Sequence, residues 1–514
     1  MTLNALIPLP VMLPIFGAAI NFLFFRRPRI QRAITLIAII ITLMLEFYML
    51  TQVDKQGTQV FHIGGWQSPF GISLVVDRFS AMLMVISTLV TLLVLFYATA
   101  QSDYTDDQDS PVSIFYPVYL ILLAGVSDAF ISGDLFNLYV GFEILLTASY
   151  VLLTMGGTSE RLRAGASYIV VSVISSFIFL MAIGMIYAAT GTVNMAQLSL
   201  RLAELPVPTQ YMLQAMLLVA FGIKAAVFPL SFWLPDSYPI AAAPITAVFA
   251  GLLTKVGIYS IIRTETLLFP QHNLSNLLIV AASLTMVLGI MGALAQDDLK
   301  RILSFTLISH VGYMLLGVSM HNVTGLTGTL YYTMHHIVIQ VALFLIAGLI
   351  SIKTGTTSLS ELGGLAKSAP LLSVLYFATA MNLGGIPPGS GFLGKVIILK
   401  SVIETQMTPL RVIAVICALV GSLLTLYAVA RIWNRAFLRP ATAVANVSDT
   451  VLNVNKLKPS MWTPTILLVA VSVSFTVYAQ PMFSLSERAA KDMLNPQSYI
   501  SLQQLQEVQS PNAH

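Results

Sequence analysis

Long apolar stretches alternate with short polar ones along nearly the whole chain. A helix needs about 20 mostly apolar residues to cross a bilayer. Reading with that length predicts 14 spans, which cover residues 3–25, 32–50, 76–98, 112–130, 134–156, 164–190, 209–233, 240–264, 274–296, 299–319, 324–352, 368–404 (interrupted), 409–437 and 461–483. The pattern therefore predicts an all-α polytopic membrane protein.

The polar stretches between these spans are too short to hold a catalytic domain. The longest lie at 51–75, 101–111, 439–460 and 484–514. The first span lacks a preceding basic region and a small-residue cleavage site, so we interpret it as a retained helix and not as a signal peptide. Residues 60–77, which begin inside the first of these stretches, alternate and contain Gly-Gly and Ser-Pro turns, which predicts a short hairpin.

Two similar polar features suggest an internal repeat. FGIK (221–224) and FLGK (392–395) lie five predicted spans apart, so spans 4–8 and 9–13 are interpreted as two five-helix units. An odd number of helices makes the second unit insert upside down, as in inverted-repeat transporters. The expected divisions are 1–111, 112–264 (first repeat), 274–437 (second repeat) and 438–514.

The basic residues predict an orientation. Loops that follow odd-numbered spans hold about twice as many Lys and Arg residues as the opposite side, and cytoplasmic loops carry such an excess. This places the hairpin and both chain termini outside. The four acids Asp103, Asp106, Asp107 and Asp109 fall on the inside, but acids weigh little in this rule.

The composition supports the membrane interpretation and excludes other classes. Only 9% of the 514 residues are charged, 57% are hydrophobic, and the mean hydropathy is +0.84. Soluble domains carry about 25% charged residues, so a cytosolic enzyme, a disordered protein and a nucleic-acid binder are excluded. The net charge of +4 is spread through the chain, and the single cysteine, Cys417, allows neither an internal disulfide nor a thiolate metal cluster.

Several ionisable residues lie well inside the predicted spans. Each costs about 2.5–3.5 kcal/mol at the bilayer centre, so each is a candidate for function. They are Glu143, Lys224, Lys255, His310, His335, His336, Lys395 and Lys400. The alternative for each is a structural ion pair or a side chain that extends to the interface, and for Lys400, near a helix end, we favour that alternative.

Lys224 and Lys395 differ from the others because each adjoins a predicted helix break. Pro229 follows the first, and Pro387, Pro388 and Gly389 precede the second. A break frees backbone groups that are tolerated at membrane depth only where protein or water satisfies them. Both lysines are therefore expected to face hydrated space.

Proton transfer is the chemistry that these residue types favour. Burial disfavours the charged form of a lysine, whereas a nearby carboxylate favours it. Glu143 is interpreted as the only acid deep within a span in the first half, which makes it the expected partner of Lys224. Histidines titrate near neutrality and can relay protons between lysines. Without Cys, Asp or Glu close by, metal ligation by the paired His335 and His336 is not expected.

One motif misleads. GSGFLGK (389–395) matches the first seven positions of a phosphate-binding loop. Val396 stands where Mg²⁺ requires Ser or Thr, and no strand precedes the motif. Nucleotide binding is therefore not expected, and no cofactor is predicted.

Three long blocks resemble one family. They are FGIKAAVFPLSFWLPDSYPIAAAPITAVFAGLLTKVGIYSIIR (221–263), QDDLKRILSFTLISHVGYM (296–314) and LGGIPPGSGFLGKVIILK (383–400). In this order they resemble the proton-translocating antiporter-like family, which includes large subunits of Mrp-type Na⁺/H⁺ antiporters and membrane-arm subunits of respiratory complex I. GLLTK with Lys255, and the short C-terminal region, look most like the D-type branch of the Mrp antiporters.

The resemblance implies roles for individual residues. Glu143 matches the family's span 5 glutamate, Lys224 and Lys255 the lysines of spans 7 and 8, His310 the span 10 relay position, His336 the span 11 histidine and Lys395 the end of the relay on span 12. Many relatives have lysine where Gln340 stands, so the histidines of span 11 are expected to take over that role. His335, Gln340 and Lys400 are retained as secondary relay candidates.

The resemblance implies a proton-translocating subunit of a multisubunit Na⁺/H⁺ antiporter in a bacterial cytoplasmic membrane. Its expected partners are other antiporter subunits, protons, Na⁺ and lipid, with no nucleic acid. Two alternatives remain open at this stage. One is a proton-pumping subunit of a respiratory NADH:quinone oxidoreductase or related complex. The other is a self-sufficient solute carrier with a binding pocket at the membrane midplane.

Overall fold

The computed structural model describes residues 3–66, 68, 70–102, 114–271, 274–440 and 459–501. Within these residues, eleven helices are long and apolar enough to cross a membrane, and Phe115–Ile131 and Pro370–Gly384 are shorter apolar helices. The polytopic all-α class is therefore supported. Most of the predicted loops at 101–111 and 439–460 lies outside the described residues.

The helices follow the predicted spans closely. The first half contains η1 (Leu3–Leu6), α1 (Leu9–Leu23), α2 (Pro28–Gln56), η2 (Ile63–Gly65), α3 (Arg78–Ser102), α4 (Phe115–Ile131), α5 (Leu135–Thr154), α6 (Ser159–Thr190), α7 (Met195–Arg201), η3 (Leu202–Glu204), α8 (Val207–Ala225), α9 (Leu234–Ser237), η4 (Tyr238–Ile240), α10 (Ala243–Val248), η5 (Phe249–Leu253), α11 (Thr254–Arg263) and η6 (Thr264–Leu268). The second half contains α12 (Ser275–Leu294), α13 (Leu299–Ser319), α14 (Val323–Thr354), α15 (Leu365–Ser368), α16 (Pro370–Gly384), α17 (Ser390–Ile403), α18 (Pro409–Ile432), η7 (Trp433–Leu438), α20 (Pro459–Val477) and α21 (Ala479–Leu494).

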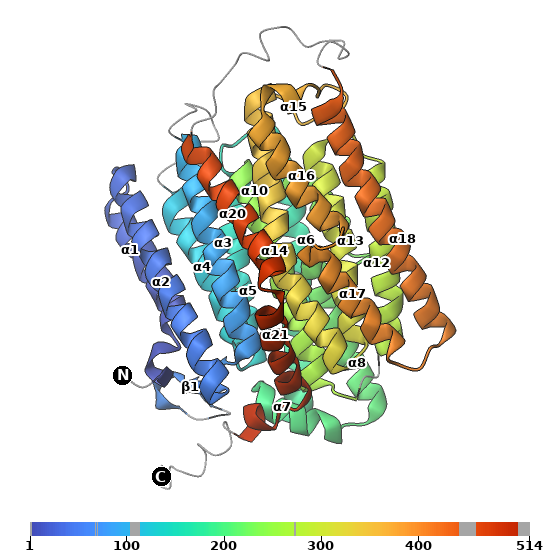
Figure 1. Cartoon of the computed structure of the whole chain (residues 1–514). Coiled ribbons are helices and arrows are strands. Elements are labelled where there is room, and N and C mark those ends of the chain that lie inside the picture. Colours follow the sequence, from blue (N-terminus) through green and yellow to red (C-terminus); the bar gives the residue numbers. More distant parts are fainter. Residues whose placement is uncertain are drawn as a thin grey trace.

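The predicted hairpin forms a two-stranded antiparallel sheet. Strand β1 (Gln59–His62) pairs with β2 (Ser73–Val76), with Gln59 opposite Val76. All four residues of β2 are buried, so this strand packs against the bundle on both faces and does not show the expected alternation of buried and exposed residues. We call the end of the bundle that carries β1 and β2 the hairpin end (Figure 1).

Two predicted interruptions are present, and one more was not predicted. Helix α8 ends at Ala225, before Pro229, and α16 and α17 are separated at residues 385–389, where Pro387, Pro388 and Gly389 lie. The additional interruption is η5, a π-helical segment between α10 and α11. Such π-bulges leave no clear sequence pattern, and they occur frequently at functional sites.

Helix α14 forms the centre of the bundle. It contacts α3, α10, α13, α16, α17, α20 and α21, and its side chains from Gly325 to Ile350 are buried. Helices α1 and α2 lie on one side of the bundle and α18 on the other (Figure 1). Polar side chains on α14 are therefore enclosed by other helices and shielded from lipid.

The last predicted span ends earlier than expected. Helix α20 ends at Val477 instead of residue 483, and α21 then runs along α14 and α3. Arg488 and Asp492 on α21 join a network of ion pairs with Asp54 and Arg78. This amphipathic helix accounts for much of the predicted polar tail, of which residues 502–514 lie outside the described residues.

A buried ion pair connects α11 to the segment that follows β2. The guanidinium of Arg263 donates to Asp77 at 2.6 Å, and both side chains are only 6% exposed. We expect Asp77→Asn to destabilise the fold by about 3–5 kcal/mol, because it leaves a buried charge without its partner. The heat stability of the detergent-solubilised chain, followed by size-exclusion chromatography, measures the loss.

The control for this prediction is an exposed pair. Asp236 and Arg301 lie 3.0 Å apart, but their side chains are 66% and 37% exposed. Asp236→Asn should cost less than about 1 kcal/mol. Equal effects of the two substitutions would show that the Asp77–Arg263 pair does not stabilise the fold.

Candidate functional site

Lys224 lies in the last turn of α8, two residues before Ala226, whose left-handed backbone (φ 58°) ends the helix. Its amine donates to the carbonyl of Ser172 at 3.3 Å and to the hydroxyl of Ser176 at 3.0 Å, both on α6. It also lies 5.5 Å from the ring centre of Phe142 on α5. The charged form of this lysine is thus stabilised by neutral oxygens and a π face.

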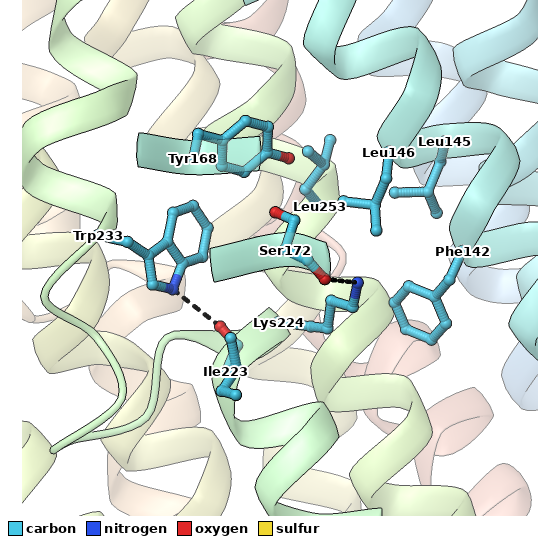
Figure 2. A pocket seen from close by; sticks show the side chains of 9 residues that line it. All are labelled: Phe142, Leu145, Leu146, Tyr168, Ser172, Ile223, Lys224, Trp233 and Leu253. Atoms are coloured by element: carbon cyan, nitrogen blue, oxygen red, sulfur yellow. Dashed lines mark hydrogen bonds between the residues drawn. The ribbon is translucent and has the colours of Figure 1, made fainter. Parts of the chain in front are cut away.

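A small cavity adjoins this amine (Figure 2). Its volume of about 10 Å³ leaves room for about one water molecule. It is lined by Phe142, Leu145, Leu146, Tyr168, Ser172, Ile223, Lys224, Trp233 and Leu253. Trp233 donates to the carbonyl of Ile223 at 3.0 Å and so ties the chain beyond the break back to α8.

Glu143 follows Phe142 on α5 and is half-buried. Its charge acts on Lys224, although the two side chains do not form a direct ion pair. One of its carboxylate oxygens is buried and accepts no hydrogen bond. The predicted partnership is therefore an electrostatic one without direct contact.

Lys255 lies just after the π-helical segment η5 and is fully buried. Its amine donates to the carbonyl of Ala250 at 2.7 Å and to the hydroxyl of Thr254 at 3.2 Å. Leu253, two residues earlier, lines the cavity beside Lys224. The π-bulge thus coincides with the position where a buried amine binds to its own helix.

Two histidines lie between Lys255 and Lys395. The rings of His310 on α13 and His336 on α14 are 5.1 Å apart, and His310 Nδ1 lies 3.1 Å from the hydroxyl of Tyr332. The charges of both lysines act on both histidines. The two imidazoles thus lie beside each other and within the electrostatic influence of both amines.

Lys395 reaches back across the break between α16 and α17. Its amine donates to the carbonyls of Leu383 and Gly384 at 3.3 and 3.4 Å and to the hydroxyl of Ser422 at 3.2 Å. The ring centre of Tyr313 lies 5.0 Å away. The carbonyls belong to the C-terminal end of α16, where the helix dipole favours a positive charge.

The secondary candidates occupy different surroundings. His335 Nδ1 lies 2.8 Å from the hydroxyl of Ser390, the first residue of α17. Gln340 is buried and donates to the carbonyl of Leu303 at 2.8 Å. Lys400 lies apart from the other candidates, because its side chain is 65% exposed and pairs with Glu404 at 3.5 Å.

Five of the six main candidates are buried within the bundle, and the rings of His310 and His336 lie side by side. We call Lys224, Lys255, His310, His336 and Lys395, together with Glu143, the lysine–histidine relay. Within the residues that the structure describes, no three His, Cys, Asp or Glu side chains gather as they would around a metal ion.

The interpretation of Glu143 as the only deep acid of the first half is wrong. Glu46 lies well inside α2 and is completely buried, and Asp128 lies near the end of α4 and is 7% exposed. The sequence contained the signal for Glu46, a lone acid within predicted span 2. The hydroxyls that contact the relay, such as those of Ser176 and Ser422, have no sequence pattern that distinguishes them from other serines in membrane helices.

Comparisons with known proteins identify the family to which the chain belongs. Residues 132–425 match the model of the family described as NADH:quinone oxidoreductase/Mrp antiporter, transmembrane region. The D-type subunit of the Na⁺/H⁺ antiporter of Alkalihalophilus pseudofirmus is 39% identical over 97% of this chain and 99% of its own length.

Two solved structures share the fold. One is a chain of the Mrp complex from Dietzia sp. DQ12-45-1b, with a TM-score of 0.88 and 29% identity over 98% of this chain and 100% of that one. The other belongs to the membrane-bound sulfane sulfur reductase, an archaeal respiratory membrane complex, with a TM-score of 0.87 and 25% identity over 96% and 99%. The 514-residue chain described here therefore belongs to the NADH:quinone oxidoreductase/Mrp antiporter family of membrane proteins.

Proposed function

We propose that this chain is the proton-translocating D-type subunit of a multisubunit Na⁺/H⁺ antiporter in a bacterial cytoplasmic membrane. The observation that carries the proposal is the 39% identity to a D-type antiporter subunit over nearly the full length of both chains. The buried series of lysines and histidines supports it, because such groups bind and release protons within a membrane. Other antiporter subunits are its expected partners.

Protons are proposed to move along the lysine–histidine relay. Glu143 stabilises the charge on Lys224, and the small cavity provides room for a water beside this amine. Lys255 follows, then His310 and His336, and Lys395 ends the series. Each amine donates to neutral carbonyl and hydroxyl oxygens, so none of the three is held in a direct ion pair that would oppose loss of its proton.

The proposal includes 14 spans arranged around two inverted five-helix repeats. The first repeat is α4, α5, α6, α8 and α10–α11, and the second is α12, α13, α14, α16–α17 and α18. Two matching corners support this division. Residues 190–194 (TGTVN) start at the last residue of α6, and residues 354–358 (TGTTS) start at the last residue of α14, each with a left-handed glycine directly after the helix.

The hydrogen bonds of the two corners also match. Thr190 donates to the carbonyl of Thr192 at 3.1 Å, and Thr354 donates to that of Thr356 at 2.9 Å. Asp134 caps α5 beside the first corner, and Asp298 caps α13 beside the second. The first corner adjoins β2, and the second precedes α15 at the opposite end of the bundle (Figure 1). An inverted relation between the halves explains this placement.

The proposed orientation places the hairpin end outside the cell. In a Cys417→Ala background, a cysteine at Phe70, which is 91% exposed, should react with a membrane-impermeant thiol reagent added to intact cells. A cysteine at the exposed Ser368, on the opposite end, should react only after the membrane is permeabilised. The reverse pattern would overturn the orientation derived from the basic loops.

A subunit of a respiratory complex is the second candidate, and the similarity to a chain of an archaeal respiratory membrane complex favours it. The test is to purify the chain with its native partners and to measure pH-gradient dissipation on Na⁺ addition in everted vesicles. Na⁺-dependent proton movement without redox substrate supports the antiporter. Proton movement that requires an electron donor would reject the antiporter function and support the respiratory one.

A further inference from the structure

The helices beside the relay contain a second set of buried polar side chains. Helices α1 and α2 pack against α4, on the side of the bundle away from α18 (Figure 1). Their buried polar groups are hydroxyl, amide and carboxyl groups, and neither lysine nor arginine is among the buried residues of α1, α2 and α4. This composition is opposite in charge to that of the lysine–histidine relay.

Glu46 occupies the middle of this set. It is completely buried, ten residues before the hairpin end of α2, which corresponds to about 15 Å of helix. The hydroxyl of Ser127 on α4 donates to one carboxylate oxygen at 3.4 Å, and Thr88 on α3 also faces this carboxyl group. The other carboxylate oxygen is buried and accepts no hydrogen bond.

Further buried polar side chains lie between this point and the hairpin end. Asp128 follows Ser127 on α4 and accepts a hydrogen bond from the amide of Asn137 at 3.1 Å. The backbone N–H of Asn137 donates to Asp134 at 2.6 Å, in the link between α4 and α5. All these side chains are at least nine-tenths buried, and the second carboxylate oxygen of Asp128 accepts no hydrogen bond.

A stripe of polar side chains continues from Glu46 to the opposite end. Thr42, Thr35 and Gln31 lie four, eleven and fifteen residues before Glu46, which places all four on the buried face of α2. Asn21 on α1 donates to the hydroxyl of Thr35 at 2.8 Å, and its own amide oxygen is buried without a hydrogen bond. We call the series from Asp134 through Glu46 to Gln31 the oxygen line.

The oxygen line has the chemistry of a cation route. Carboxylate, hydroxyl and amide oxygens are the ligands that hard cations prefer, and acidic side chains select cations in channels. An isolated buried carboxylate is too costly to remain charged without a counter-ion, so Glu46 must hold a proton or another cation. The positive lysines of the relay, by contrast, repel a metal cation.

We propose that the oxygen line is the Na⁺ route of this subunit, separate from the proton relay, with Glu46 and Asp128 as its principal ion-binding groups. The proposal rests on the antiporter function argued above and adds the path of the second ion. It assigns Na⁺ to α2 and α4 and protons to the lysine–histidine relay.

The test uses the assembled complex in everted vesicles. The Na⁺ concentration that gives half-maximal dissipation of a pH gradient should rise about tenfold or more in Glu46→Gln and in Asp128→Asn, because each loses a charged ion ligand. Glu46→Asp, which keeps the carboxylate, should recover part of the Na⁺ affinity. Binding of ²²Na⁺ to the purified complex should weaken strongly in Glu46→Gln and Asp128→Asn and less in Glu46→Asp.

Two matched controls separate ion binding from general damage. Glu265→Gln also removes a completely buried carboxyl group. The amide of Gln214 donates to this group at 2.7 Å, and neither residue belongs to the oxygen line. The substitution should therefore leave the Na⁺ requirement unchanged. Thr42→Val should raise that requirement, whereas Thr425→Val on α18 should not. Both threonines donate to the carbonyl four residues earlier, at 2.9 and 2.7 Å.

The outcomes distinguish the two proposals. If wild-type vesicles show no Na⁺-dependent proton movement, the antiporter function is wrong. Binding of ²²Na⁺ to the wild type and to the acid variants then still tests whether the oxygen line binds Na⁺. If antiport is present and both acid variants keep the wild-type Na⁺ requirement and ²²Na⁺ binding, the Na⁺ route is wrong. A lower maximal rate with an unchanged Na⁺ requirement would likewise reject it.

Discussion

Replacing Lys395 with arginine is expected to lower antiport by about a hundredfold or more while the complex still assembles. Arginine can keep the positive charge beside the carbonyls of Leu383 and Gly384, which Lys395 now contacts. It does not lose its proton in proteins, and a positioned proton-transfer group typically contributes about 10²–10⁴-fold to rate. The dissipation of a pH gradient on Na⁺ addition to everted vesicles measures the loss.

The same helix provides the control. Lys400 lies on α17, five residues after Lys395, but its side chain is 65% exposed, so Lys400→Arg should transport normally. Glutamate at position 395 can gain and lose a proton, unlike arginine, so Lys395→Glu should retain partial transport. Near-normal antiport by Lys395→Arg would mean that this lysine is a fixed counter-charge for the freed carbonyls.

Glu143→Gln is expected to reduce antiport severely, by at least about tenfold. The substitution removes the charge that stabilises protonated Lys224, whose amine otherwise contacts only the neutral oxygens of Ser172 and Ser176 and a ring face. The effect should be strongest at alkaline pH, where the amine most needs this stabilisation to hold a proton. Proton movement in everted vesicles from neutral to alkaline pH measures it.

The change itself is nearly isosteric and lies on a half-buried position, so membrane insertion and assembly should survive. Glu160→Gln, in the exposed first turn of α6, removes an acid away from the relay and should transport normally. Wild-type antiport by Glu143→Gln over the whole pH range would refute the coupling between Glu143 and Lys224.

The long apolar helices could be predicted well because a helix that crosses the bilayer needs a long run of consecutive apolar residues, and such a run is visible in the sequence. The break beside Lys395 was equally accessible, since Pro387 and Pro388 cannot continue a helix. The break after Lys224 ends the helix earlier than Pro229 alone suggests, at the left-handed Ala226. The position of that turn depends on packing between distant helices.

The contacts of the candidate site could not be predicted, because they depend on which faces of distant helices pack together. The carbonyls and hydroxyls that hold Lys224 and Lys395 come from α6, α16 and α18, and sequence distance conceals these contacts. Glu46 was accessible in principle, as a lone acid in an apolar span, but its importance follows from its contact with α4. The sequence T-G-T also recurs at 190–192 and 354–356, in addition to the two lysine motifs from which the repeat was predicted.

The small size of the cavity beside Lys224 has a consequence for energy conservation. A continuous file of water would let protons run down their gradient whether or not Na⁺ moved, and the antiporter would become a leak. A space of about 10 Å³ with largely hydrocarbon walls holds about one water, so no such file can form there. In the proposed relay, each proton therefore stops on the amine of Lys224, and at that stop its passage can be coupled to the transport of another ion.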